Sequence, residues 1–184
     1  QAEEYPRDNG VRQAIERLKQ VNELYGDVEQ LLIAMLREVG ELTHSPFAVV
    51  LKHTLTDSEQ PRYVSIAAQS QRPEGEWSSL ELSGALLLDQ STRPVFDALL
   101  QRRAMVMNRS SLACLNRFNS YWPSIDRAML IPLGMNKNNR HLICIGNSST
   151  HYHTAEVQKL WPILIHVSTQ MQILMSSTEK NAIK

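Results

Sequence analysis

A mixed polar and aromatic segment in the second half of the chain holds the side chains best suited to bind a small molecule. The candidate binding residues are Asn108, Arg109, Ser111, Tyr121, Trp122 and Asp126. Ligand sites combine an apolar wall with a few convergent polar groups, and this segment supplies both kinds. The planar guanidinium of Arg109 suits an anionic or amide-bearing ligand, because it donates hydrogen bonds in pairs. Two alternatives stay open: the segment is a polar surface loop, or Phe118 and Trp122 simply fill the space.

Other kinds of chemistry have little support in the sequence. The cysteines Cys114 and Cys144 cannot form a structural zinc site unless histidines join them. His151 and His153 could chelate a metal only if their loop turns suitably, and two solvated loop histidines are the alternative. The signatures of a P-loop, a nucleophile elbow and a metalloprotease helix do not occur. We therefore expect no catalytic residues and no metal site, and the sequence identifies no cofactor.

The bulk composition is that of one globular domain with helical extensions. The chain has 184 residues, with 19 Lys and Arg against 19 Asp and Glu, so its formal net charge is zero. Nucleic-acid-binding domains usually carry a basic excess, so we expect no direct nucleic-acid binding. Sparse cysteines fit a reducing compartment, and no apolar run approaches the ~20 residues that span a bilayer. We expect a cytoplasmic location, and the start at Gln1 indicates a fragment of a larger protein.

Helical periodicity dominates both ends of the chain. The first stripe, with spacings of three and four, consists of Val11, Ala14, Leu18, Val21, Tyr25, Val28, Leu32, Met35, Val39 and Leu42. The second stripe consists of Val157, Leu160, Leu164, Val167, Met171 and Leu174. The first predicts one long helix, or two helices broken near Gly26 with Asp27 as the cap. The second predicts a helix from Thr154, in which Pro162 introduces a kink or begins the packed portion.

The two halves of the first stripe have different expected partners. Residues 28–42 have a wide apolar face, which favours packing on the domain's own sheet. Residues 11–25 have a narrower face among many charges. We interpret this part as a seam with a second copy, and packing within the chain is the alternative. The two stripes together predict a homodimer through residues 11–25 and 157–174.

Between the helical segments the pattern is that of short strands. Strands are predicted at residues 47–51, 62–68, 104–108, 128–133 and 141–146. Val49, Ile131 and Ile143 should be buried within them. Residues 69–83 are polar and predict an irregular segment, whereas Pro94 predicts the first turn of a further helix.

Two stretches resemble the GAF domain family. Residues 94–108 are similar to its segment in which a short helix leads into a strand ending in Asn or Asp. Residues 124–133, followed by 140–147 and 154–174, resemble its closing hairpin, with an apolar-Pro-Leu strand, and its C-terminal helix. The resemblance implies an α+β sandwich: an antiparallel sheet with the N- and C-terminal helices packed on one face and a ligand cavity on the other. The predicted divisions are a flexible leader (1–10), a dimerisation or linker helix (11–27), a GAF-like domain (28–175) and a C-terminal tail (176–184).

The resemblance also implies a sensory and regulatory role. GAF domains are commonly dimeric through their terminal helices and usually precede an output module such as a kinase, a cyclase or a transcription activator. Bilin-binding members attach the chromophore through a cysteine in the region of Cys114, typically followed by His, but Leu115 follows it here. We predict a regulatory sensor, not an enzyme, that binds a small molecule or relays a signal through dimeric terminal helices. The alternative is a ligand-free dimerisation module with a degenerate, filled cavity.

Overall fold

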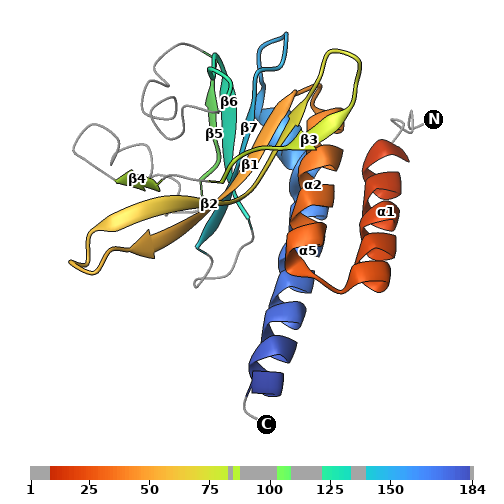
Figure 1. Ribbon diagram of the computed structural model, residues 1–184. Helices are drawn as coiled ribbons and strands as arrows, with labels where there is room; N and C mark the ends of the chain where they lie inside the picture. The colour runs from red at the N-terminus through yellow and green to blue at the C-terminus, as the bar shows by residue number, and fades with distance from the viewer. Residues whose placement is uncertain (1–8, 83–84, 88–102, 109–121, 134–139, 183–184) are drawn as a thin grey trace.

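The computed structural model describes residues 9–82, 85–87, 103–108, 122–133 and 140–182, which form an antiparallel sheet with helices on one face (Figure 1). The helices are α1 (Asn9–Tyr25), α2 (Val28–Leu42) and α5 (Thr154–Ala182). The strands are β1 (Phe47–Leu55), β2 (Pro61–Gln71), β3 (Trp77–Ser79), β4 (Ala85–Leu87), β5 (Met105–Met107), β6 (Ala128–Pro132) and β7 (His141–Gly146). The seven-stranded sheet has the order β3-β2-β1-β7-β6-β5, and β4 pairs with β2 beside this path. None of the described helices is long and apolar enough to cross a bilayer.

The N-terminal helical stretch consists of two helices, one of the two arrangements that the sequence left open. Gly26 has a φ of 57°, in the left-handed region that glycine adopts without steric cost, and α1 ends directly before it. The Asp27 carboxylate accepts a hydrogen bond from the backbone N–H of Glu29, which caps the start of α2. The break lets α2 turn back alongside α1 (Figure 1).

The main core lies between the sheet and the helices. The strand residues that contribute to it are Ala48, Val50, Ala67, Met129, Ile131, Ile143 and Ile145. The stripe residues Leu32, Met35 and Val39 of α2 and Leu160, Leu164 and Val167 of α5 pack against them. Since successive strand residues point to opposite faces, Val49 lies on the other side of the sheet. Val49, Ile131 and Ile143 are all buried, so this prediction is confirmed.

Helix α1 forms an outer layer, packed on α2 and α5 on the side away from the sheet (Figure 1). Its stripe residues Val11, Ala14 and Leu18 are buried in the main core within a single chain. The interpretation of these three residues as a seam with a second copy is therefore wrong. The physical reason is that α2 and α5 together offer an apolar surface that the narrow stripe covers. The α5 stripe is buried in the same core through Val157, Leu160, Leu164, Val167 and Met171. A homodimer therefore stays a prediction, and it must use residues other than these.

Five strands (β1, β2, β5, β6 and β7) lie at predicted positions, whereas β3 and β4 do not. β1 and β2 extend further than predicted, to Leu55 and Gln71. β3 lies within residues 69–83, where an irregular segment was expected, and β4 was not predicted. Three residues are too few to display an alternating pattern, which explains both omissions. The helix expected around Pro94 lies outside the described residues.

Gly40 of α2 provides a test of how tightly β3 packs on the helix. A Cβ atom at position 40 would collide with the Trp77 ring and lie 3.0 Å from the Ser45 carbonyl oxygen. The Trp77 Nε1–H donates to the Glu41 carboxylate at 2.9 Å, which holds the ring in place. We expect Gly40→Ala to lower the free energy of unfolding by about 1–3 kcal/mol through overpacking, measured by urea denaturation. The double variant with Trp77→Ala should lose the clash with the ring; an unchanged urea midpoint for Gly40→Ala alone would refute the contact.

Candidate functional site

The face of the sheet opposite the helices carries a second apolar cluster, which we call the distal face. Its buried members are Phe47, Val49, Leu51, Tyr63, Ala68, Ile125, Ala128, Leu130, Leu142 and Cys144. Four partly buried residues pack against them: Leu80, Met105, Met107 and Trp122. This is the face on which the resemblance predicts the ligand cavity. It offers the extended apolar wall that a small-molecule site needs.

Trp122, predicted to cover a ligand, is part of this wall. Its ring lies 5.5 Å from the ring of Phe47, centroid to centroid, at an interplanar angle of 54°. Its Nε1–H donates to the carbonyl oxygen of Glu81 at 2.9 Å. These two contacts hold the indole against the distal face with its polar atom satisfied.

Asp126 lies in the loop that enters β6, and Asn147 fixes this loop to the end of β7. The Asn147 side chain accepts from the Asp126 backbone N–H and donates to the Ser124 carbonyl oxygen, both at 2.9 Å. Asn147 has a φ of 70°, which asparagine tolerates better than most residues. Sequence reasoning missed Asn147; an asparagine directly after a predicted strand was the available signal. The Asp126 residue is exposed, as a ligand contact at the rim requires.

Asn108, which directly follows β5, forms hydrogen bonds with the backbone of Tyr152, two residues before α5 begins. Its Nδ2–H donates to the Tyr152 carbonyl oxygen at 2.9 Å, and its Oδ1 accepts from the Tyr152 N–H at 2.7 Å. Both ends of the amide are therefore used within the protein. Asn108 acts in this structure as a positioning residue for the segment that enters α5.

Tyr152 extends this connection to the end of α2. Its hydroxyl lies 2.6 Å from Ser45 Oγ and accepts from the Ser148 N–H at 3.0 Å. Ser45 Oγ is in turn 2.8 Å from Thr43 Oγ1, and Thr43 follows α2 directly. Burial raises the pKa of Tyr152 to about 12. The Tyr152 clamp, as we call these bonds of Tyr152 with Asn108, Ser45 and Ser148, joins β5, α2 and the start of α5.

Removing the Tyr152 hydroxyl should destabilise the domain in a pH-dependent manner. Tyr152→Phe leaves the Ser45 hydroxyl and the Ser148 N–H without this buried partner, so we expect a loss of about 1–3 kcal/mol at neutral pH. The folded pKa of about 12 lies above the ordinary 10.0, so the protonated phenol is favoured in the folded state. This contribution is complete below pH 10 and is lost as the pH rises towards 12.

Urea denaturation at several pH values measures both effects. The wild type should lose stability more steeply than Tyr152→Phe between pH 10 and 12. Tyr25→Phe is the matched control, because Tyr25 is 59% exposed. Equal stability of wild type and Tyr152→Phe at neutral pH would show that the Tyr152 hydroxyl contributes nothing to stability.

The remaining predicted residues divide into two groups. Arg109, Ser111 and Tyr121 lie outside the described residues, as does Cys114. His151 and His153 are exposed, and within the described ranges no group of three His, Cys, Asp or Glu side chains is placed to hold a metal ion.

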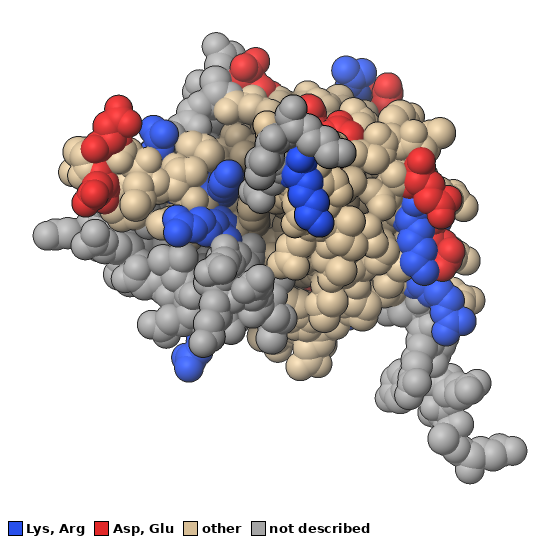
Figure 2. All heavy atoms as spheres, turned by 90° about the horizontal axis from the view of Figure 1, so that it is seen from below, with Lys and Arg blue, Asp and Glu red and all other residues tan. Residues whose placement is uncertain are grey.

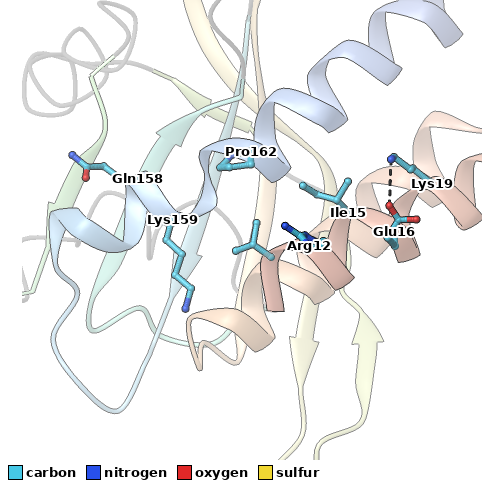
Figure 3. Close-up of a pocket in the computed structure, with 8 residues that line it drawn as sticks. Arg12, Ile15, Glu16, Lys19, Gln158, Lys159 and Pro162 are labelled. Atoms are coloured by element: carbon cyan, nitrogen blue, oxygen red, sulfur yellow. Dashed lines mark hydrogen bonds and ion pairs between the residues drawn. The ribbon is translucent and has the colours of Figure 1, made fainter. Parts of the chain in front are cut away.

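A second candidate site is a groove between α1 and the first half of α5, which sequence reasoning did not predict. It has a volume of about 590 Å³ and is lined by Val11, Arg12, Ile15, Glu16, Lys19, Gln158, Lys159 and Pro162 (Figure 3). The two helices run in the same direction (Figure 1). Further along both helices, the Asn22 Nδ2–H donates to Gln170 Oε1 at 3.0 Å. Ile15 and Pro162 give the groove apolar surface, and Glu16 pairs with Lys19 at its side at 3.3 Å. The groove is open to solvent, so it suits a docking contact better than an enclosed ligand.

Comparison with known proteins identifies the architecture. No model of a known family matches the sequence, and no curated protein matches it. The structure matches the GAF domain of a phosphoenolpyruvate-protein phosphotransferase from Acinetobacter, with a TM-score of 0.62 and 13% identity over 91% of this chain and 93% of that one. It matches a biliverdin-bound protein in its far-red absorbing dark state with a TM-score of 0.66 and 13% identity, over 90% and 99% of the chains.

A segment of a methyl-accepting chemotaxis protein gives a TM-score of 0.63 at 11% identity, over 88% of this chain and 98% of that one. Similarities at such low identity concern the fold. The matches cover almost the whole of each compared chain. This chain therefore has the fold of GAF domains, as its resemblance to that family predicts.

Proposed function

We propose that this chain is a sensory regulatory domain that binds a small molecule on the distal face and passes the bound state to α5. GAF-like folds at this level of similarity occur in a phosphotransferase, a chemotaxis protein and a biliverdin-binding protein, which supports a sensory role. The observation that carries the proposal is the pair of hydrogen bonds between Asn108 and Tyr152. It ties the residue that begins the predicted binding segment to the residue that leads into α5.

The Tyr152 clamp offers a physical route from ligand to helix. A ligand held by Arg109, Ser111 and Tyr121, against Trp122 and Asp126, would change the position or the freedom of the segment after Asn108. Because Asn108 holds the Tyr152 backbone, the start of α5 and the end of α2 would respond together. Such a ligand shifts the equilibrium between two arrangements only by its difference in affinity for them.

Helix α5 is the proposed path to an output domain. It has 29 residues, and its last turns extend beyond the sheet and α2 (Figure 1). Ile165, Ile173 and Met175 are exposed on it, so we propose that a second copy covers them in a homodimer. The output module would be a kinase, a cyclase or a transcription activator in the cytoplasm, with no catalysis or nucleic-acid binding by this domain itself.

The second candidate function is a dimerisation module without a ligand. The contact between Trp122 and Phe47 favours it, because an indole packed on the sheet occupies space that a ligand would use. The two functions differ in whether the isolated chain binds a small molecule with an affinity that depends on Arg109.

A ligand screen tests the proposed function. We expect thermal-shift measurements with anionic and amide-bearing metabolites to yield a compound that raises the melting temperature. At a hundredfold excess over its Kd, the compound should add about 2.7 kcal/mol to the free energy of unfolding. Native mass spectrometry should show one molecule bound per chain. Arg109→Ala should abolish the shift without lowering the melting temperature of the free protein, whereas the control Arg72→Ala should retain it. If no compound in a broad set binds and light scattering shows a dimer, the results would favour the dimerisation module.

A further inference from the structure

Cationic residues from four strands lie at or near the strand ends that point to the bottom of Figure 1, which form one edge of the sheet. The four residues are Lys52 in β1, Arg62 at the start of β2, Arg103 just before β5 and Arg140 just before β7. We call this row the cationic edge. The pairing register places their backbones at neighbouring strand ends: Arg62 lies opposite Thr54, Lys52 lies opposite His141, and the His53 N–H donates to the Arg140 carbonyl oxygen at 2.7 Å. Met105 lies opposite Leu130, so antiparallel pairing brings Arg103 to the end of β6 at the same edge.

Carboxylates do not neutralise the cationic edge within the described part of the chain. The ion pairs among the described residues lie away from this edge. Arg17 pairs with Glu38 and Lys19 with Glu16 on the helices, and Arg72 pairs with Glu76 at the turn after β2. Arg62 donates through Nε to the neutral hydroxyl of Thr54 at 3.1 Å. Figure 2 shows the molecule from below: several Lys and Arg side chains lie in the left half of the view, while the acidic side chains lie at the left tip and along the upper and right margins.

Two histidines at the same edge respond to this positive charge. Burial is the main cause that lowers the pKa of His141 to about 4, and the charge of Lys52 lowers it further. The pKa of His53 is also lowered, first by burial and then by Arg140. The cations are thus close enough to disfavour further positive charge, and such an array attracts anionic partners.

We infer that the cationic edge binds an extended acidic segment of another protein or domain. Adjacent strands are about 4.8 Å apart, so the row from β2 to β5 spans about 19 Å over the four intervals of the sheet order. An extended chain rises about 3.3 Å per residue, so about six residues cover the row. A single small anion would reach only a fraction of these cations. Alternating acidic side chains on an extended segment would meet several of them at once.

The observations favour an acidic peptide over a single-stranded nucleic acid. Nucleic-acid grooves combine cations with exposed aromatic rings on which bases stack. The aromatic ring that the structure describes at this edge is Tyr63, which stacks edge-on with His53 and is only 1% exposed. The net charge of the chain is zero, so the positive character is local.

Fluorescence anisotropy with the full chain tests this inference. The probe is a labelled peptide of about eight residues that alternates Glu and Ser, measured at about 20 mM and about 200 mM salt. The wild type should bind it, and the higher salt should weaken binding. Arg62→Gln with Arg140→Gln should reduce affinity about tenfold, since each rim pair contributes up to about 1 kcal/mol. Arg17→Gln with Arg72→Gln, two cations outside the row, is the matched control and should stay within twofold of the wild type.

Three results would overturn the inference. One is no binding by a folded wild type, as judged by its circular dichroism. Another is equal binding by the double variant and the wild type. The third is tighter binding of an oligothymidylate of the same charge that is lost in the double variant, which would identify the edge as a nucleic-acid surface instead. None of these results depends on a ligand at the distal face.

Discussion

Ile143→Ala will lower the free energy of unfolding by about 2–5 kcal/mol, the usual cost of truncating a fully buried aliphatic side chain. Ile143 has no exposed surface, and it pairs with Val50 of β1 and Ile131 of β6 at the centre of the sheet. All three side chains face the helices, so the cavity would open where the sheet meets the main core. Urea denaturation followed by circular dichroism measures the change.

Leu24→Ala is the matched control for this substitution. It removes the same number of carbon atoms from α1, but Leu24 is 74% exposed, so the expected change is below about 1 kcal/mol. Equal effects of the two substitutions would mean that β7 does not occupy the centre of the sheet.

Leu18→Glu will destabilise the packing of α1 on the rest of the domain. Leu18 has no exposed surface and lies in the main core, so the carboxylate would be buried without a partner. An unpaired buried charge costs on the order of several kcal/mol, more than a single outer helix can readily tolerate. We expect α1 to detach, with a lower unfolding midpoint and with faster amide exchange in residues 11–25.

Gln20→Glu places the same charge on an exposed position of the same helix and should change little. The result that would contradict the single-chain packing is specific. If Leu18→Glu converted a dimer into a monomer of unchanged stability in light scattering, the α1 stripe would be an intermolecular seam.

The stripe on α1 shows how far sequence periodicity reaches. The spacing of Val11, Ala14 and Leu18 predicts an amphipathic helix that needs an apolar partner, and the structure contains that helix. The spacing does not identify the partner, because α2, α5 and a second copy would all satisfy the same stripe. The choice depends on the surface that α2 and α5 form together, which is a tertiary property.

The candidate site shows the same division. A polar residue such as Asn108 at the end of a strand could be predicted to donate and accept hydrogen bonds. Its partner Tyr152 lies 44 residues further along the chain, and no local pattern connects the two. Tyr152 could not be predicted as part of the site, because a tyrosine in a polar loop carries no sign that its ring will be buried. Trp122 stays a predicted ligand contact, and its packing on Phe47 could not be predicted because it depends on the order of the strands.

Hydrogen exchange of the ligand-bound and free chain tests most directly whether the distal face is coupled to α5. With a compound from the screen, the amides of residues 152–160 should exchange several times more slowly in the bound wild type. In Asn108→Ala the same compound should still bind, but the protection of residues 152–160 should disappear. Protection that reaches residues 152–160 equally in Asn108→Ala, or that never reaches them in the wild type, would contradict a relay through the Tyr152 clamp.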